Sequence, residues 1–148
     1  MKISGKTKIC GIIGDPVEHS VSPALQNAAF QALNLDYVYV PFRVEPSGLE
    51  KAIQGMRALK MRGLNVTIPH KVAVMSFLDE IDAMAEHLGA VNTIVNQDGY
   101  LKGYNSDAAG FIQSLSGNGI DPRGLNITIL GAGGAARAVS FILADKGA

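Results

Sequence analysis

The sequence predicts an α/β fold: a mainly parallel open sheet with helices on both faces, an antiparallel hairpin at one edge, and an incomplete further βα unit. Three observations predict it. Short β-branched runs alternate along the chain with segments of helical periodicity. Asp98-Gly99, a strong hairpin signal, lies between two of these runs. A glycine-rich turn at 131–134 separates the last β-branched run from the last helical segment.

The composition of the chain limits the classes of protein to which it can belong. With 148 residues, it has the size of one domain and part of another. Hydrophobic residues make up 47% and charged residues 18%, which is typical of a globular protein with a core. Lys plus Arg and Asp plus Glu number 13 each, so we expect no nucleic-acid partner. No run reaches the ~18 apolar residues of a membrane span, and we expect a cytoplasmic protein without membrane association.

One cysteine and three histidines provide few groups for metal or redox chemistry. Cys10 excludes an internal disulfide, and its apolar surroundings in the sequence indicate a buried thiol. Because the histidines are scattered along the chain, we expect no metal site.

The chain opens with a predicted strand and helix. Residues 8–14 are interpreted as a buried strand that ends at a glycine. Ser22 is predicted to be the N-cap, and Pro23 the first residue, of a helix that runs to Leu33. Ser20 and Ser22 therefore lie at a helix start, where free backbone N–H groups favour anions. From these residues alone, serines that only cap the helix are the simpler interpretation.

A second strand and helix follow at once. Residues 36–44 carry β-branched and aromatic residues and are predicted to be a strand. Residues 46–59 are predicted to be a helix with an apolar inner face, formed by Leu49, Ile53, Met56 and Leu59. Two strand–helix units in succession indicate parallel strands joined by right-handed crossovers.

Residues 63–71, with the sequence GLNVTIPHK, hold a concentration of polar groups. A short β-branched strand ends there, and Pro69 suits the first turn of a following helix. Asn65, Thr67 and Lys71 should then lie at a strand end, where open α/β sheets bind ligands. An amide, a hydroxyl and a cation suit a small ligand rich in oxygen. On its own, a lysine at a helix start is more often a solvated surface charge.

A hairpin is predicted beyond the next helix. Residues 79–88 carry apolar residues at helical spacing, and Gly89 suits the position just past the helix. Residues 90–96 and 100–104 are predicted to be antiparallel strands joined by the Asp-Gly turn. Asn92 stands in a strongly apolar stretch, where it either closes a local hydrogen bond or contacts a ligand.

Another helix is predicted from Asp107 to about Ser116. Either Asn105 or Ser106 can cap it. Asp107 falls in the first turn, where the helix dipole favours a carboxylate. An aspartate is common in that position, so this residue alone does not indicate a function.

The last element is predicted to be an incomplete Rossmann-type βα unit. Residues 126–130 are a predicted strand, and the helix that follows runs to Lys146. Between them lies a G-x-G-x-x-A spacing, which lets a backbone approach the pyrophosphate of a dinucleotide. The predicted cofactor-binding residues are Gly131, Ala132, Gly133, Gly134, Ala135 and Ala136.

Five motifs, in the expected order, resemble those of the shikimate dehydrogenase family. They are HSVSP at 19–23, GLNVTIPHK at 63–71, AVNT at 90–93, YNSD at 104–107 followed by Gly110, and GAGGAAR at 131–137. The resemblance that they carry extends over nearly the whole chain. One position departs from the family pattern, because Ser106 stands where threonine is usual; the hydroxyl is kept and a methyl group is lost.

The resemblance implies a role for each polar residue. Lys71 would be the general acid in reduction, and Asp107 would orient Lys71 and bind a neighbouring hydroxyl. The two asparagines would hold ring hydroxyls, and the two serines and the threonine would hold the substrate carboxylate. The implied substrate-binding residues are Ser20, Ser22, Asn65, Thr67, Lys71, Asn92 and Asp107.

The reaction implied by the resemblance is the reduction of 3-dehydroshikimate to shikimate by NADPH, in aromatic amino-acid biosynthesis. Two alternatives remain open. One is a quinate or shikimate dehydrogenase that uses NAD, and the other is a non-enzymatic shikimate-sensing module. The presence of both Lys71 and Asp107 argues against the sensor, because a sensor needs no proton shuttle.

We expect the chain to be truncated, with a substrate-binding domain at 1–105, a connecting helix and loop at 106–124, and the first unit of a cofactor domain at 125–148. The residue that reads the ribose 2′ position, ~20 residues past the first glycine, would fall beyond Ala148. The chain itself is therefore expected to be inactive. A single βα unit cannot bury both faces of its strand, so we also expect a homodimer through this unit.

Overall fold

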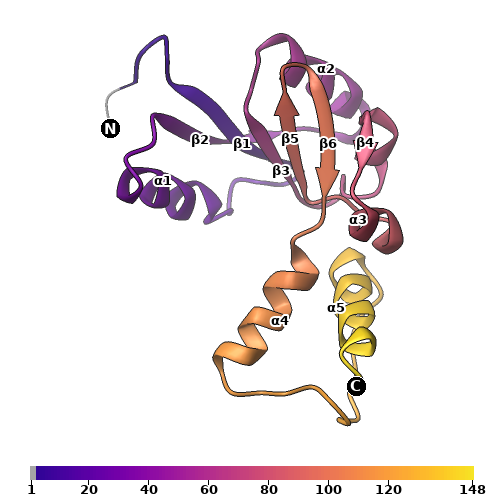
Figure 1. Cartoon of the computed structure of the whole chain (residues 1–148). Coiled ribbons are helices and arrows are strands. Elements are labelled where there is room, and N and C mark those ends of the chain that lie inside the picture. The colour runs from indigo at the N-terminus through magenta and orange to yellow at the C-terminus, as the bar shows by residue number, and fades with distance from the viewer. Residues whose placement is uncertain (1–2) are drawn as a thin grey trace.

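The computed structural model describes residues 3–148, and its centre is one six-stranded sheet in the order β2-β1-β3-β5-β6-β4 (Figure 1). The strands are β1 (Lys8–Gly14), β2 (Tyr37–Arg43), β3 (Gly63–Val66), β4 (Glu80–Ile81), β5 (Thr93–Gln97) and β6 (Tyr100–Tyr104). The helices are α1 (Ser22–Ala32), α2 (Leu49–Ala58), α3 (Ala83–Leu88), α4 (Asp107–Gly117) and α5 (Gly134–Asp145), with short 3-10 helices η1 (Pro46–Gly48) and η2 (Ala73–Phe77). Among residues 3–148, none of these helices combines the length and the apolar character that crossing a membrane requires.

The predicted fold class is confirmed by the pairing of the strands. β1 pairs in parallel with β2 and β3, whereas β5 pairs antiparallel with both β3 and β6. The predicted turn joins β5 to β6, with positive φ angles of 52° at Asp98 and 98° at Gly99. Positive φ at both central residues matches the right-handed twist of a two-residue hairpin. The antiparallel pairing of β5 with β6 therefore depends on local turn chemistry.

β4 is a strand that the helical spacing of residues 79–88 does not predict. It pairs in parallel with β6, so the hairpin lies one place in from the sheet edge. The helix begins only at Ala83, where Asp82 caps it by accepting a hydrogen bond from Met84 N at 3.0 Å. The helical spacing is a local pattern, whereas β4 forms because β6 offers it a partner. Gly89 ends α3 with φ 61°, as predicted.

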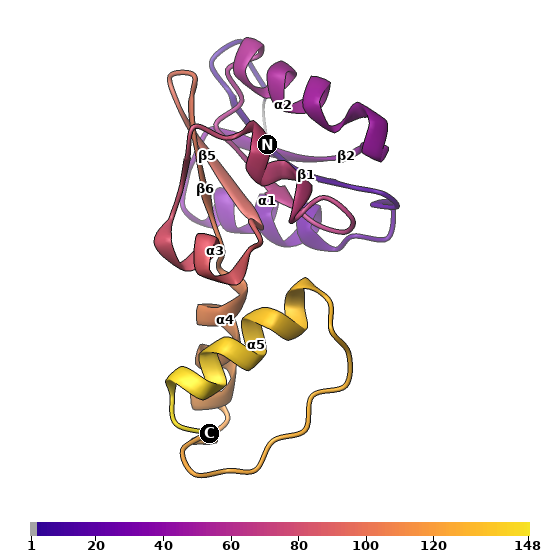
Figure 2. The same ribbon diagram turned by 90° about the vertical axis from the view of Figure 1, so that its right-hand side faces the viewer.

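Helices cover both faces of the sheet, with α2 on one side and α1 on the other (Figure 2). Under α2, the larger core packs Leu49, Ile53 and Met56 against side chains of β1, β3, β5 and β6. Under α1, a smaller cluster includes the buried Tyr39 of β2. Leu59 was predicted on the inner face of α2, but it is 72% exposed because the helix ends one residue earlier.

Two predicted helix starts are wrong. Ser22 is already the first residue of α1; Val21 occupies the N-cap, and no side chain caps the helix. No helix begins at Pro69, which lies in a turn; the next helical element, η2, begins at Ala73. In this turn, His70 N donates to Thr67 O at 2.9 Å. Both corrections concern the backbone conformation at the start of an element, which the motifs alone do not specify.

α4 and α5 lie side by side below the sheet (Figures 1 and 2). α5 is held within the chain by an apolar cluster that joins it to α3 and α4, with Leu88, Ala108, Ala138 and Ile142 at its centre. The strand predicted at 126–130 does not form, and Leu130 is 94% exposed. A strand needs a neighbour for its N–H and C=O groups, and this segment pairs with no strand among residues 3–148.

Candidate functional site

Lys71, Asp107 and Asn92 form one hydrogen-bonded group. Lys71 Nζ lies 2.6 Å from Asp107 Oδ2, and Asn92 Nδ2 donates to Asp107 Oδ1 at 2.7 Å. The side chains of Lys71 and Asp107 are 19% and 29% exposed, so water is largely excluded while a small ligand can still reach them. Because both carboxylate oxygens accept hydrogen bonds, the orientation of Asp107 is set, and Asp107 in turn holds the ammonium group in place.

The segment that carries Lys71 is fixed at several points. Thr67 N donates to a carbonyl of β1 at 2.9 Å, which continues the parallel pairing past the end of β3. A ring nitrogen of the buried His70 lies 2.6 Å from Val44 O. Val91 N donates to Lys71 O at 2.8 Å, so the backbones of the lysine and asparagine segments are joined directly. The side chain of Lys71 thus starts from a rigid backbone.

Asp107 is positioned by the start of α4. Asn105 lies one residue before the N-cap position, which Ser106 occupies, and Asn105 Oδ1 accepts from Asp107 N at 2.9 Å. The amide of Asn105 also donates to Ala90 O at 2.9 Å, so Asn105 attaches the start of α4 to the chain just before β5. In the first turn of α4, Asp107 is further stabilised by the helix dipole. Ser106, the other candidate, makes no side-chain cap.

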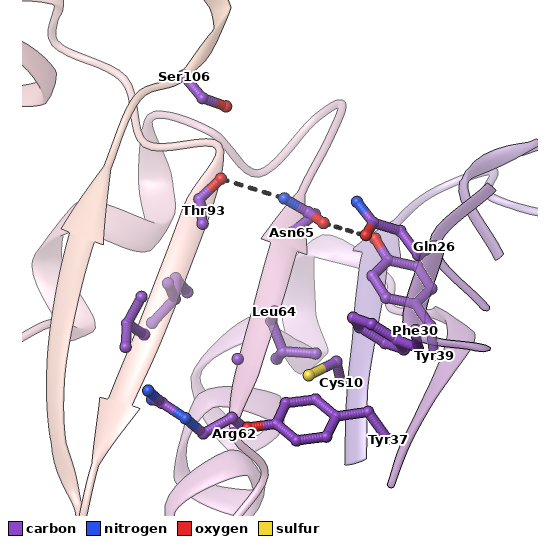
Figure 3. A pocket seen from close by; sticks show the side chains of 14 residues that line it. Cys10, Gln26, Phe30, Tyr37, Tyr39, Arg62, Leu64, Asn65, Thr93 and Ser106 are labelled. Carbon is purple, nitrogen blue, oxygen red and sulfur yellow. Dashed lines mark hydrogen bonds between the residues drawn. The ribbon is translucent and has the colours of Figure 1, made fainter. Parts of the chain in front are cut away.

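Asn65 belongs to a second polar group, which joins the first through β5 (Figure 3). Asn65 and Thr93 are paired across β3 and β5, and Asn65 Nδ2 donates to Thr93 Oγ1 at 3.1 Å. Thr93 Oγ1 donates to Asn92 Oδ1 at 2.9 Å. On the other side, the Tyr39 hydroxyl donates to Asn65 Oδ1 at 2.7 Å. Thr93 belongs to the AVNT motif at 90–93, so the sequence pointed to it. Tyr39 could not be found in this way, because no local pattern distinguishes it from other tyrosines in strands.

The remaining predicted residues lie nearby in the fold without joining this network. Ser20 Oγ accepts from Ser22 N at 3.3 Å, and both side chains are partly exposed. Thr67 follows β3, and the two serines follow β1. Because β1 and β3 are parallel neighbours, Thr67 and both serines lie beyond the carboxyl ends of these strands. Within residues 3–148, no hydrogen bond links their side chains to Lys71. A Cβ at Gly14 would lie 2.5 Å from Thr67 Cγ2, so this close approach requires glycine.

A cavity of about 490 Å³ runs along the α1 face of the sheet. Asn65, Thr93 and Ser106 line its end nearest the Lys71–Asp107 pair, and Arg62 lies toward the opposite end (Figure 3). Lys71 and Asp107 themselves do not line this cavity. The polar groups of the two clusters therefore adjoin a space large enough for a ring-sized ligand, which suits a small polyhydroxylated molecule.

The glycine-rich turn lies against the lysine. Gly131 has a φ angle of 118°, which residues other than glycine rarely adopt. Gly133 is the N-cap of α5. A Cβ at Gly131 or Gly133 would meet nothing within 4 Å, so the backbone is open to a ligand, as pyrophosphate binding requires. A Cβ at Gly134 would lie 3.8 Å from Lys71 Cδ. A second cavity, of about 680 Å³, separates this turn from the end of α3.

The fold and site together define an α/β domain with a polar cavity beside its sheet, followed by a glycine-rich turn and a helix. Residues 12–94 match the family described as "Shikimate dehydrogenase substrate binding domain". The chain belongs to this family.

Individual relatives are similar over nearly all of the chain. "Shikimate dehydrogenase (NADP(+))" from Desulforamulus reducens is 54% identical over 99% of the chain and 50% of the relative. The structure of shikimate 5-dehydrogenase from Listeria monocytogenes in complex with shikimate and NAD is 44% identical, with a TM-score of 0.93 over 99% of this chain and 51% of that one. A ligand-free 5-ketofructose reductase from Gluconobacter sp. is 38% identical, with a TM-score of 0.88 over 98% and 52%. The chain thus spans about half the length of the curated relatives it matches.

Proposed function

We propose that the whole protein reduces 3-dehydroshikimate to shikimate with NADPH, a step of aromatic amino-acid biosynthesis. The observation that carries the proposal is the ion pair of Lys71 and Asp107 at 2.6 Å, held by Asn92 beside the glycine-rich turn. Family membership and the names of the relatives support the choice of substrate and cofactor.

The residues of the site suit a ketone reduction. When bound, NADPH supplies a hydride to the carbonyl carbon. Negative charge then develops on the carbonyl oxygen, where Lys71 Nζ donates a hydrogen bond and then a proton. Asp107 keeps Lys71 in position through Oδ2 and uses its other oxygen to bind Asn92. In the reverse direction, Lys71 takes the proton back from the substrate hydroxyl.

The other polar residues would bind the substrate. Three neutral hydroxyl donors lie beyond the carboxyl ends of β1 and β3 and suit the carboxylate of the substrate; they belong to Ser20, Ser22 and Thr67. Asn65 and Asn92 would hold ring hydroxyls. The longest hydrogen bond of Asn65, 3.3 Å to the backbone oxygen of Asn92, is the one that a ligand hydroxyl would most readily replace.

The cofactor would lie at the start of α5, with its pyrophosphate on the turn formed by Gly131, Ala132, Gly133, Gly134, Ala135 and Ala136. This assignment supports a division into a substrate-binding part at 1–105, a connection at 106–124 and the beginning of a cofactor-binding part at 125–148. We also propose a cytoplasmic location, which the need for NADPH supports.

The test is an assay of 3-dehydroshikimate reduction by the whole protein, followed as loss of NADPH absorbance. We expect turnover with NADPH. Calorimetric binding of shikimate without any turnover would contradict the proposal and favour the sensing module. For the chain of 148 residues alone, we expect weak shikimate binding and no NADPH oxidation. A rate equal to that of the whole protein would show that the site needs no further residues.

One observation favours a second candidate, a shikimate or quinate dehydrogenase that uses NAD. The Listeria monocytogenes structure contains NAD together with shikimate. Parallel assays with NADH, and with quinate in the reverse direction, separate this candidate from the first. Because the Gluconobacter relative is named a 5-ketofructose reductase, 5-ketofructose belongs in the same assay as a third substrate.

We further propose that the segment before α5 associates with a second copy of the chain. Leu125, Ile127 and Leu130 are 47%, 42% and 94% exposed, which favours burial against another surface. Sedimentation velocity should show a dimer that Leu130→Asp dissociates. The control is Leu25→Asp, on the exposed side of α1, which should leave the dimer intact. A monomer at every protein concentration would contradict this proposal.

A further inference from the structure

Five residues form a chain of hydrogen bonds in which each donor points toward the next residue and finally toward Asp107. Tyr39 donates to Asn65 at 2.7 Å, and Asn65 donates to Thr93 at 3.1 Å. Thr93 donates to Asn92 at 2.9 Å, and Asn92 donates to Asp107 at 2.7 Å. We call these five residues the donor chain. Hydrogen bonds aligned in one direction polarise one another, so a change at one end affects the other.

Backbone groups set the direction of the donor chain. Ser106 N donates to Asn92 Oδ1 at 3.0 Å, which leaves the NH₂ group of Asn92 to face Asp107. The backbone oxygen of Asn92 can only accept, and Asn65 Nδ2 donates to it at 3.3 Å. Asn65 Oδ1 must therefore face Tyr39. Only a donor can satisfy this oxygen, which requires a protonated hydroxyl at position 39.

Tyr39 meets this requirement and is itself firmly held. The residue is 4% exposed, and burial together with the neighbouring Cys10 raises the pKa of Tyr39 to about 12. The amide of Asn27, on α1, accepts from Tyr39 N and donates to Tyr39 O, both at 2.9 Å. Because α1 begins at Ser22, the tyrosine links the helix of the serine pair to the lysine site.

We propose that Tyr39 is a positioning residue, which acts through Asn65, Thr93 and Asn92 to fix the orientation of Asp107 and hence of Lys71. The statement about catalysis rests on the proposed reductase function, whereas the coupling along the donor chain does not. Tyr39 is buried, and its hydroxyl is taken up by the hydrogen bond to Asn65. Its contribution is to the geometry of the groups further along the donor chain.

The first test uses the isolated side-chain amide signals of Asn65 and Asn92 in NMR spectra of the chain. Tyr39→Phe should shift both signals, although Asn92 does not touch Tyr39, and the backbone spectrum should report an intact fold. The matched control is Tyr37→Phe. Tyr37 lines the same cavity and packs edge-on against Phe30, and within residues 3–148 its hydroxyl makes no hydrogen bond. It should leave the Asn92 signal unchanged.

A shift confined to Asn65, or an equal shift of Asn92 in the Tyr37→Phe control, would overturn the proposal. Thr93→Val supplies a second variant, because it interrupts the donor chain in the middle. In the Thr93→Val background, Tyr39→Phe should still shift Asn65 but no longer Asn92. A shift of Asn92 that persists there would show that the effect travels by another route.

The second test measures the reaction of the whole protein. Tyr39→Phe should lower kcat roughly 3–10-fold, which is the effect of one hydrogen bond, with little change in KM. Combined with Thr93→Val, it should cause no further loss, because both variants break the same chain. Losses that multiply would contradict the positioning role. If the NMR coupling is present but the wild-type protein has no turnover, the proposed function fails and the donor chain stands.

Discussion

Lys71 Nζ lies 2.6 Å from Asp107 Oδ2, although 36 positions separate the two residues in the chain. The lysine comes from the turn after β3, and the aspartate comes from the first turn of α4. A Cβ at Gly134, the first residue of α5, would lie only 3.8 Å from Lys71 Cδ. The pair is therefore located where the sheet domain meets the glycine-rich turn, and the proposed proton transfer and hydride transfer would occur side by side.

Lys71→Ala should lower kcat of the whole protein by about 10²–10⁴-fold, the usual contribution of a general acid, with modest change in substrate affinity. Steady-state kinetics with 3-dehydroshikimate and calorimetry with shikimate measure the two effects. The matched control is Lys102→Ala, because Lys102 also forms an ion pair, with Glu80 of the edge strand β4 at 2.6 Å. Unchanged turnover in Lys71→Ala would refute the assigned role.

Asp107→Asn should lower kcat by about 10²-fold or more, because Lys71 loses its charged partner and its fixed orientation. The double variant Lys71→Ala/Asp107→Asn should be no slower than Lys71→Ala alone, since the two residues act as one unit. Asp121→Asn, which removes a carboxylate paired with Arg123 on the surface, is the control. Losses that multiply in the double variant would mean that the two residues act independently.

Ser20→Ala and Ser22→Ala should each raise KM roughly 10-fold and leave kcat nearly unchanged, because each removes one hydrogen bond to a charged group of the substrate. With the methyl ester of shikimate, which lacks the negative charge, the KM values of the variants and the wild type should differ least. Ser76→Ala removes an exposed hydroxyl bonded to Ala73 O and should have no effect. A fall in kcat with constant KM would place the serines in the chemical step.

Tyr39 should make stability depend on alkaline pH. Burial, and secondarily Cys10, raises the pKa of Tyr39 from 10.0 to about 12. The unfolded state loses the phenolic proton near pH 10.0, whereas the folded state retains it, so stability is complete below pH 10.0 and falls as pH rises toward about 12. Over this range the wild type should lose on the order of 2 kcal/mol more unfolding free energy than Tyr39→Phe.

Urea unfolding at a series of alkaline pH values measures this difference. Tyr37→Phe provides the control, since Tyr37 lies on the same strand and lines the same cavity. Its unfolding free energy should follow the wild-type dependence on pH. If Tyr39→Phe and the wild type lose stability in parallel, Tyr39 does not retain its proton, and the direction of the donor chain is wrong.

Asp79 should make stability depend on acidic pH. The hydrogen bond from Arg57, and then that from the backbone N–H of Leu101, lowers the pKa of Asp79 below its ordinary value of 3.8. The stabilisation is therefore complete above pH 3.8 and is lost as pH falls through the lower, folded-state pKa. Asp79→Asn should cost about 1 kcal/mol of unfolding free energy at neutral pH. This difference should shrink in acid, whereas Asp145→Asn should change little at either pH.

Much of the fold follows from local patterns. The helix α2 and the turn at Asp98-Gly99 were predictable because each depends on neighbours within a few residues. The strand β1 was predictable from its apolar run, and it has β2 and β3 to pair with. β4 was not predictable, because its two residues form a strand only by pairing with β6. The segment 126–130 has strand-forming residues but no neighbouring strand in the part of the chain that the structure describes, and so it stays irregular. Propensity therefore sets what a segment can form, and pairing sets whether it does so.

The sequence by itself determined the residue types of the site and their order in motifs, which was enough to show a resemblance to a family and so to imply a carboxylate-binding, proton-transferring site. Only the tertiary structure decided that Asp107 meets Lys71, and that Tyr39 reaches Asn65 across the intervening strand β1. The physical reason is one of range. Periodicity along a chain reports which face a side chain occupies, whereas a hydrogen bond requires two groups to lie within about 3 Å, which depends on the packing of distant elements.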